Sequence, residues 1–237
     1  MTPPRPAGPP WRVVVLAAPS GGGKTTIANE LRRRHPRVFG YSVSATTRKP
    51  RVGEKDGEAY HFLTREEFQR RVRAGEFLEW AEYAGELYGT LRAEVKRVLA
   101  SERHVVLDIE VQGARQVRTV YPRPSSVSIF VIPPSPRVLI ERLRKRRTES
   151  EKELGERLAI AVSEVEAARD DAVAGRLFDH VLVNDDLETA VNRVIEIVEH
   201  PEALKHRPTD AAGLLADFVR ELERAADQLK QSAKRSM

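Results

Sequence analysis

Short apolar runs alternate with segments of helical periodicity along most of the chain. Five runs read as strands, the last of them shorter than the others: "RVVVLAA", "HVVLDIE", "SVSIFVI", "DHVLVND" and "YSVSA". Helical patterns occupy residues 25–34, 91–100, 138–144, 152–174 and 187–199. Strands that alternate with helices in this way predict an α/β fold, with a largely parallel sheet and flanking helices.

The alternation is interrupted between residues 48 and 89. There the chain reads "EAYHFLTREEF" and then "EFLEWAEYAGELYGT", in which apolar and polar residues alternate around a turn at Gly85. A period of two indicates antiparallel strands. We therefore expect an inserted subdomain in this region, and an insertion of this size usually carries function.

The two ends of the chain differ from the rest. The opening "MTPPRPAGPP" predicts a disordered Pro-rich leader over residues 1–11 rather than a signal peptide. A C-terminal helical extension is expected over residues 201–237, and its last helix has one apolar stripe, formed by Leu214, Phe218, Leu222, Ala225 and Leu229. We expect this stripe to pack on the core, with pairing in a homodimer as the alternative.

Composition narrows the possible partners. The chain of 237 residues has no Cys, which favours a reducing, cytoplasmic location, and it has no apolar run long enough to span a membrane. Its net charge is +5, and much of the basic excess falls in "TTRKPR" and "ERLRKRR". Two separate basic segments favour two local phosphate sites over a nucleic-acid-binding face, so neither nucleic acid nor membrane is an expected partner.

The stretch "APSGGGKTT" follows the first predicted strand and precedes a helix. It matches the P-loop pattern G-x-x-x-x-G-K-[ST], except that Ala18 stands in place of the first glycine. Glycine-rich backbone can direct N–H groups at phosphates, Lys24 can reach the β- and γ-phosphates, and the Thr25 hydroxyl can bind Mg²⁺. A simple strand-to-helix turn would explain the glycines but not Lys-Thr. The predicted ATP-binding residues here are Ala18, Pro19, Ser20, Gly21, Gly22, Gly23, Lys24 and Thr25.

Asp108 ends the apolar run "HVVLDIE". In a chain with a P-loop, a carboxylate at a strand end is expected near the metal, so Thr25 and Asp108 are the predicted ligands of Mg²⁺ as cofactor. The alternative is an acidic residue that only terminates the strand.

A second group of phosphate-binding candidates lies in "SVSATTRKPRVGEKDGEAYHF". Arg48 and Arg51 flank Pro50, and two guanidinium groups at this separation can grip one tetrahedral phosphate, with Tyr60 adding a hydroxyl donor. Further along, "FLEWAEYAGELYGT" supplies Glu79, Tyr88 and Thr90.

Five segments in this order resemble bacterial guanylate kinases over roughly residues 13–200: "APSGGGKTT", "SVSATTRKPRVGEKDGEAYHF", "EFLEWAEYAGELYGT", "LDIEVQGARQV" and "VNDD". The resemblance implies transfer of the γ-phosphoryl of ATP to GMP, and also to dGMP, giving ADP and a nucleoside diphosphate in purine metabolism and GMP recycling. It implies a P-loop kinase domain over residues 12–200, with a mixed α/β GMP-binding insertion at about 42–92 and a mobile lid at about 137–157.

The same resemblance assigns roles to individual residues. The residues that it implies for GMP binding are Ser44, Glu79 and Thr90 for the guanine, Arg48, Arg51, Tyr60 and Tyr88 for the phosphate, and Glu54 and Asp108 beside them. It places Asn184 with the ATP-binding residues. The catalytic residues that it implies are Lys24, Arg48 and the lid arginines Arg142, Arg146 and Arg157. Glu110 departs from the family, which usually has Asp there, as do Leu87 and Arg147.

The chemistry of guanine supports a carboxylate at Glu79. A carboxylate can accept from both N1–H and the exocyclic amino group of guanine, whereas adenine lacks the N1 donor and would leave it unpaired. Three alternatives remain at this stage. They are a scaffold domain that holds phosphopeptides in the acceptor site, a sister kinase acting on a phospho-sugar, and a nucleic-acid-binding protein. The intact Gly-Lys-Thr disfavours the scaffold, and the set of Ser44, Glu79 and Thr90 favours a guanine base over a sugar.

Overall fold

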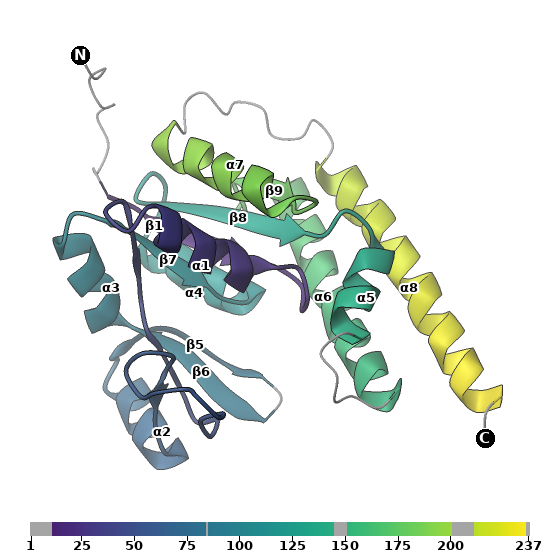
Figure 1. The fold of residues 1–237 in the computed structure, drawn as a ribbon, viewed down its shortest axis with the longest axis horizontal. Helices are drawn as coiled ribbons and strands as arrows, with labels where there is room; N and C mark the ends of the chain where they lie inside the picture. The colour runs from purple at the N-terminus through teal and green to yellow at the C-terminus, as the bar shows by residue number, and fades with distance from the viewer. Residues whose placement is uncertain (1–10, 84, 145–150, 201–210, 236–237) are drawn as a thin grey trace. The chain divides into compact units, whose positions relative to one another are not determined.

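The computed structural model describes residues 11–83, 85–144, 151–200 and 211–235, and the chain folds into two compact units. The first unit comprises Met1–Val15 with Leu31–Val127, and the second comprises Leu16–Glu30 with Ser128–Met237. The division therefore passes through strand β1 (Val13–Ala17) and helix α1 (Lys24–Arg34) (Figure 1).

A five-stranded sheet in the described residues has the order β2-β7-β1-β8-β9, with β2 at Phe39–Tyr41, β7 at His104–Asp108, β8 at Ser126–Ile132 and β9 at His180–Val183. The pairs β2–β7 and β8–β9 are parallel. Every residue of β1 and of β8 is buried, because helices cover both faces of a parallel sheet and leave no polar side. The predicted parallel sheet is confirmed, but "YSVSA" is not one strand: β2 ends at Tyr41 and β3 begins at Ser44.

Most helices begin and end within two residues of the predicted bounds. Besides α1, these are α3 (Arg92–Ala100), α5 (Pro136–Arg144), α6 (Glu151–Ala174) and α7 (Leu187–Glu199). Helix α4 (Val111–Val120) was not predicted. Its first turn contains Gly113, which weakens the helical signal, and its N-cap is the side chain of Glu110. Within the described chain no helix combines the length and apolarity that a membrane crossing needs.

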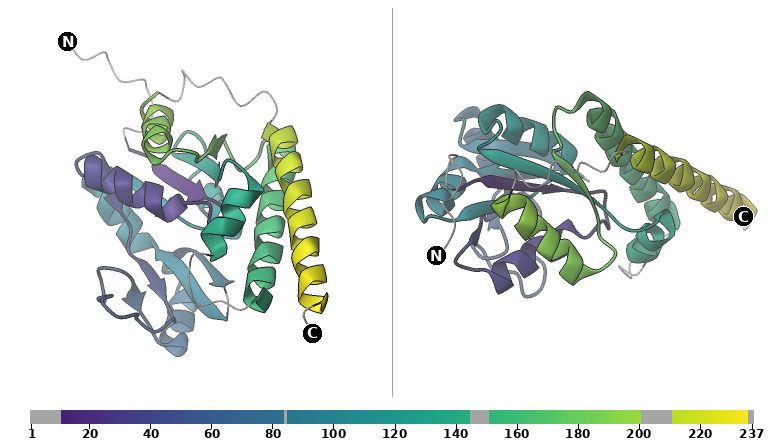
Figure 2. Two further views of the ribbon diagram at one scale, coloured as in Figure 1. Left: turned by 45° about the vertical axis from the view of Figure 1, so that its right-hand side comes forward. Right: turned by 90° about the horizontal axis from the view of Figure 1, so that it is seen from above.

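The C-terminal helix α8 (Ala211–Arg235) runs antiparallel to α6 and lies along its side in two views (Figures 1 and 2). Its buried stripe consists of Leu215, Phe218, Val219 and Leu222. The facing helix buries Leu158, Ala161, Val165 and Ala168. The predicted docking of this helix on the chain is confirmed, but its predicted stripe was wrong at Leu214, which is 37% exposed. The observed buried face of α8 is rotated by about one residue from the predicted face. The sequence allowed both faces because it contains two pairs of adjacent apolar residues, Leu214–Leu215 and Phe218–Val219.

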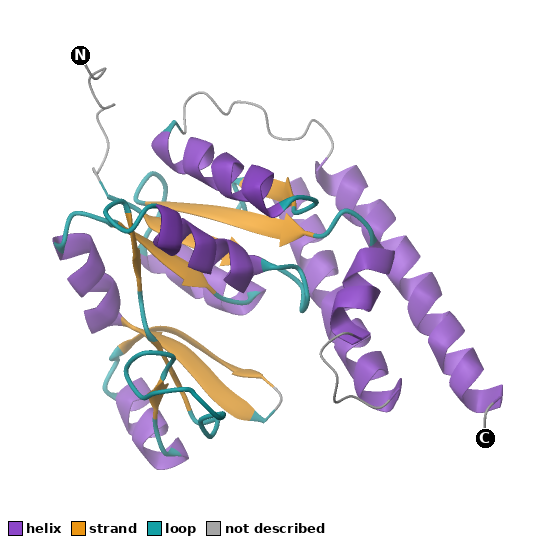
Figure 3. Ribbon diagram, in the orientation of Figure 1, coloured by secondary structure: helices purple, strands orange, loops and turns teal. Residues whose placement is uncertain are grey.

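The second sheet has four described strands in the order β4-β3-β6-β5, with β3 at Ser44–Thr46, β4 at His61–Phe62, β5 at Phe77–Tyr83 and β6 at Glu86–Leu91. Pairs β3–β6 and β5–β6 are antiparallel, as predicted, and β3–β4 is parallel. Figure 3 shows the long β5–β6 hairpin, whose turn contains Gly85 at φ +80°. Glycine suits this turn because it takes positive φ without a steric penalty.

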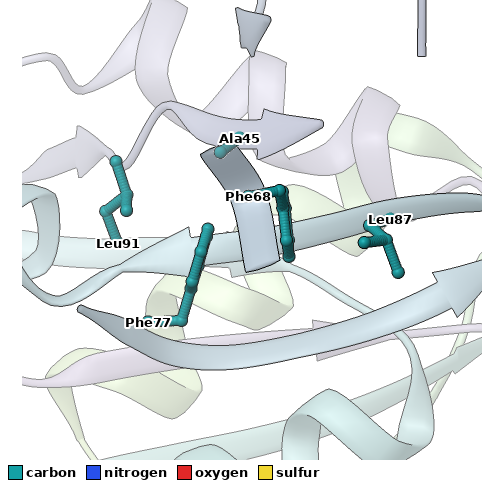
Figure 4. Packing of buried hydrophobic residues seen from close by; sticks show 5 residues of the cluster. All are labelled: Ala45, Phe68, Phe77, Leu87 and Leu91. Carbon is teal, nitrogen blue, oxygen red and sulfur yellow. The ribbon is translucent and has the colours of Figure 1, made fainter. Parts of the chain in front are cut away.

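One face of this second sheet packs on helix α2 (Arg65–Arg73), through the cluster of Ala45, Phe68, Phe77, Leu87 and Leu91 (Figure 4). The Phe68 and Phe77 rings stack with centroids 4.3 Å apart. "LTREEF" was expected to belong to a strand, and that expectation was wrong. Thr64 caps the helix by accepting from the Glu67 amide at 3.2 Å, and Glu66 lies in the first turn, where a negative charge is favourable.

Candidate functional site

The glycine-rich loop between β1 and α1 lies in the second unit and has the backbone that a phosphate cradle needs. Gly21 and Gly23 have φ of +85° and +97°, and the Gly22 amide donates to the Pro19 carbonyl at 2.8 Å. A Cβ on Gly22 would come within 2.7 Å of the Ala18 Cβ, so the loop is closed too tightly for a side chain there. Successive amides of such a loop, with the amino end of α1, form an anion-binding concavity.

Asn184 and Arg142 hold the other side of this loop. The buried Asn184 amide donates to the Gly22 carbonyl at 3.0 Å, and a Cβ on Gly23 would lie 2.3 Å from its nitrogen. The Arg142 guanidinium donates to the Gly22 carbonyl at 3.5 Å and to the Asn184 carbonyl at 3.3 Å. These groups border an open cavity of about 400 Å³, lined by Gly21, Gly23, Thr26, Arg142, Asn184, Asp185 and Leu187.

The other residues predicted to bind ATP or to belong to the lid are placed as follows. Lys24 and Thr25 begin α1, with Lys24 half-buried and Thr25 exposed. Arg157 is half-buried on α6, and Arg146 lies outside the described residues. Pro19 is buried and Ser20 half-buried. The loop therefore offers backbone donors, a cation and a hydroxyl on one short segment, the set that a polyphosphate requires.

Strand register in the first unit brings together three residues that are distant in sequence. Ser44 is opposite Thr90, and Thr90 is opposite Glu79, so these residues form one row across β3, β6 and β5. The register shifts between Phe77 and Glu79, because Phe77 pairs with Leu91 while Glu79 pairs with Thr90. This β-bulge directs Glu79 to the face opposite the Phe77 cluster, so that the row lines the other face of the sheet.

The environment of the Glu79 carboxylate disfavours its charged form. Only 4% of the residue is exposed, and burial raises the pKa of its carboxyl to about 7. Thr90 opposes this shift, whereas the Glu110 and Asp108 carboxylates add to it. The Thr90 hydroxyl is itself buried and makes no hydrogen bond of normal geometry within the described residues. A buried carboxylate with a raised pKa beside a buried hydroxyl is an arrangement that is typical of a site for a polar ligand.

Arg48 lies beside this row and is held by several groups. Its guanidinium donates to Glu54 Oε1 at 2.9 Å and to the Lys49 carbonyl at 2.7 Å. The same carboxylate of Glu54 accepts from the Arg51 amide at 2.7 Å. The Arg48 Cζ atom also lies 5.4 Å from the Tyr60 ring centroid. Hydrogen bonding to Glu54 raises the pKa of Arg48 and lowers the pKa of Glu54.

The aromatic residues and Asp108 complete this group. The Tyr60 and Tyr88 rings meet edge to face at 6.1 Å, and the Arg51 side chain is exposed. Asp108 ends β7, and its charge contributes to the raised pKa of Tyr60 and of Tyr41, after burial as the main cause. The site thus combines a buried carboxylate, a fixed cation and phenol hydroxyls, which suits an anionic ligand with a hydrogen-bonding ring.

Sequence reasoning missed three parts of these sites. Tyr41 ends β2, whose register with β7 places it at the same sheet edge as Asp108. Glu164 on α6 accepts from the Ser20 amide at 3.1 Å, across 144 residues of sequence. Gly113 on α4 lies against the Glu79 carboxylate. Only Tyr41 had a usable signal, since parallel strands end at one edge; the other two depend on tertiary packing.

Comparisons with known proteins point to one family. The guanylate kinase family profile matches residues 11–201. A guanylate kinase from Synechocystis sp. is 46% identical over 191 residues, covering 81% of this chain and 95% of its own length. One from Rubrobacter xylanophilus is 50% identical over 187 residues, covering 79% and 93%, and the one from Homo sapiens is 46% identical, covering 76% and 88%. The crystal structure of guanylate kinase from Anaplasma phagocytophilum superimposes with a TM-score of 0.63 at 32% identity, covering 87% of this chain and 94% of that one.

Proposed function

Because this chain belongs to the guanylate kinase family, and so phosphorylates GMP to GDP with ATP, we propose how its residues divide that reaction. The loop of residues 18–25 holds the phosphates of ATP, with Lys24 at the β- and γ-phosphates and Asn184 at the adenine side. Support for this comes from the positive φ of Gly21 and Gly23 and from the hydrogen bond of Asn184 to the loop. Arg142, Arg146 and Arg157 act as the lid cations over the donor.

The acceptor is bound in the first unit. Ser44, Thr90 and Glu79 read guanine, and Arg48, Arg51, Tyr60 and Tyr88 hold its phosphate. The observation that supports this most is the single in-register row of Ser44, Thr90 and Glu79, in which a buried carboxylate stands next to a buried hydroxyl. Guanine offers two adjacent N–H donors to one carboxylate, so the row can both bind and select the base.

Glu54 acts through Arg48 rather than on the nucleotide. Its carboxylate carries the same sign of charge as the GMP phosphate, and its two oxygens already accept from the Arg48 guanidinium and the Arg51 amide. It therefore orients the Arg48 guanidinium and fixes the backbone at Arg51. We also propose dGMP as a second acceptor, since the base and the phosphate that these residues would contact are the same in GMP and dGMP.

Mg²⁺ is the proposed cofactor, and the chemistry of the two proposed ligands suits it. Thr25 and Asp108 supply a hydroxyl and a carboxylate, hard oxygen ligands of the kind Mg²⁺ prefers, and Mg²⁺ at phosphates commonly needs only one or two protein ligands. Thr25 and Asp108 would hold the ion, which would supply positive charge to offset the charge of the transferred phosphoryl group. Lys24 and the lid arginines add positive charge there, while Arg48 and Arg51 orient the attacking phosphate oxygen. Catalysis then depends on positioning and charge compensation, because phosphoryl transfer needs little covalent help.

The test is ADP release from ATP and Mg²⁺ with GMP, dGMP, AMP, UMP or no acceptor. Turnover with GMP of order 1–100 s⁻¹ is expected for a kinase. Glu79→Ala should lower kcat/KM for GMP by roughly 100-fold or more, because it removes an acceptor of two charge-assisted hydrogen bonds. The matched control is Glu82→Ala on the same strand, since Glu82 is exposed and forms an ion pair with the exposed Arg65 at 3.3 Å.

Two results would contradict the proposal. Equal loss in Glu79→Ala and Glu82→Ala would show that the strand, not the buried carboxylate, matters. Release of ADP that no nucleotide acceptor stimulates would favour a phosphopeptide-holding scaffold or a sugar-phosphate kinase on the same framework.

A further inference from the structure

Gly113 on helix α4 lies against the Glu79 carboxylate. A Cβ built at this position would lie 2.6 Å from Glu79 Oε2 and 3.2 Å from its Cδ. Protein Cβ atoms essentially never approach another heavy atom below 3.0 Å, so any side chain at 113 would compete with the carboxylate for the same space. Glycine within a helix costs about 0.5–1 kcal/mol relative to alanine, and nothing in the helix itself calls for one here.

Two amides in the first turn of α4 already have an acceptor other than Glu79. Glu110 caps the helix, and its carboxylate accepts from the Gln112 amide at 2.8 Å and from the Gly113 amide at 2.5 Å. A helix amino end normally attracts a nearby carboxylate to its free N–H groups. Because Glu110 occupies the amides of Gln112 and Gly113, the Glu79 carboxylate is not drawn to them and can accept from a ligand.

Helix α4 is also fastened to strand β5 beside Glu79. The Gln116 side chain accepts from the Trp80 amide at 3.2 Å and donates to the Trp80 carbonyl at 2.9 Å. Strand β5 is at the edge of its sheet, so its outward-facing backbone groups have no neighbouring strand among the described ones. The Gln116 side chain provides the partner for the Trp80 amide and carbonyl. Gln116 lies one turn after Gly113, so the helix cannot move away from residue 79 without breaking both bonds. The side chain of Glu79 would therefore have to move if residue 113 gained a Cβ.

We propose that Gly113 and Gln116 are positioning residues that set where the Glu79 carboxylate stands, and through it the affinity for the guanine base. The missing Cβ of Gly113 leaves room for Oε2, and Gln116 fixes the distance between helix and strand. This inference rests on the proposed role of Glu79 in binding the acceptor base.

The principal test is Gly113→Ala, compared with wild type and with Gln112→Ala. The control replaces an exposed residue in the same helical turn and changes helix propensity in the same direction. For Gly113→Ala the KM for GMP should rise about tenfold or more, the expected cost of displacing one charge-assisted hydrogen bond. The KM for ATP and the melting temperature should stay near wild type, because alanine favours the helix.

A rescue experiment separates displacement of the carboxylate from general disturbance. Glu79→Asp shortens the side chain and withdraws its oxygens from residue 113, so it should raise the KM for GMP by itself. Adding Gly113→Ala to Glu79→Asp should then raise the KM for GMP by less than about a further twofold, since the oxygen that would clash has moved away. Gln116→Ala provides an independent variant, expected to raise the KM for GMP about threefold with the KM for ATP unchanged.

The outcomes are distinct. An unchanged KM for GMP in Gly113→Ala would overturn the inference. So would an equal rise of the KM for GMP when Gly113→Ala is introduced into the wild type and into Glu79→Asp. If Gly113→Ala does not fold, an unchanged KM for GMP in Gln116→Ala would overturn it instead. Failure of the proposed function would be visible in the wild-type protein itself, as ADP release that GMP does not increase.

Discussion

Glu79 is a carboxylate that water barely reaches, and its environment decides its charge. Burial is the main cause of its raised pKa, and the neighbouring carboxylates of Glu110 and Asp108 act in the same direction. An uncharged carboxylic acid accepts poorly from two N–H donors, whereas the ionised form accepts from both. Loss of its proton should therefore accompany binding of the acceptor base.

This linkage predicts a pH dependence. With a pKa of about 7 for Glu79, the KM for GMP should rise as pH falls from 8 to 6, approaching tenfold per pH unit below 7, while the KM for ATP changes less. The GMP phosphate itself titrates near pH 6, so Glu79→Gln is the control that keeps this second titration. If the KM for GMP depended on pH in the same way in the wild type and in Glu79→Gln, the pH dependence could not be assigned to the Glu79 carboxylate.

The same pKa shift has a consequence for the protein without nucleotide. Between pH 4.5 and about 7 the folded chain binds more protons at Glu79 than the unfolded chain does. The contribution of the protonated Glu79 side chain to the free energy of unfolding is therefore complete below pH 4.5, and it is lost as pH rises through about 7. Measured against Glu79→Gln, the free energy of unfolding of the wild type should fall over this interval.

At the scale of elements, helix α8 lies beyond the residues that the family profile matches, and it packs along α6. Helix α6 carries Arg157 and also Glu164, which accepts from the phosphate loop at Ser20. The apolar stripe of α8 is therefore expected to stabilise the helix that carries two residues of the proposed ATP site.

Truncation of this stripe should destabilise the chain. Leu222 is fully buried, so Leu222→Ala should lower the free energy of unfolding by about 3 kcal/mol, through lost burial and the cavity left behind. Leu214→Ala, on the exposed face of the same helix, should change it by less than about 0.5 kcal/mol. Urea unfolding of both variants is the measurement. Similar midpoints for the two would mean that the α6–α8 contact does not contribute to stability.

At the scale of the whole molecule, the phosphate loop belongs to one compact unit and the row of Ser44, Thr90 and Glu79 to the other. Transfer requires the reacting phosphorus and oxygen to approach to about 3–3.5 Å with water excluded. Each unit is therefore expected to bring its own substrate to a closed state that both substrates stabilise together.

Closure can be measured by small-angle scattering. The radius of gyration should decrease when a non-hydrolysable ATP analogue and GMP are both present, and decrease less with either alone. The Glu79→Ala variant, which should not retain GMP, is the control for the analogue by itself. An unchanged radius with both ligands at saturating concentration would contradict closure.

The sequence by itself determined the features that depend on neighbouring residues. The strands β1, β7, β8 and β9 follow from apolar runs, most helices from their periodicity, and the turn at Gly85 from glycine chemistry. Helix α2 could also have been found, because Thr64 and Glu67 have capping-box spacing. The order of the motifs predicted the family, which is confirmed. The spacing of Gly23, Lys24 and Thr25 predicts phosphate binding by the loop between β1 and α1, and this stays a prediction.

Only the tertiary structure decided the arrangements between distant segments. A shift of one residue would have turned Glu79 to the other face of its strand, and the bulge after Phe77 sets that register. The contact of Gly113 with Glu79 and the hydrogen bond of Glu164 to Ser20 join residues 34 and 144 positions apart. The buried face of α8 was chosen by packing on α6, since its own sequence allowed two. Such choices depend on which surfaces exclude water together, and a linear pattern does not record them.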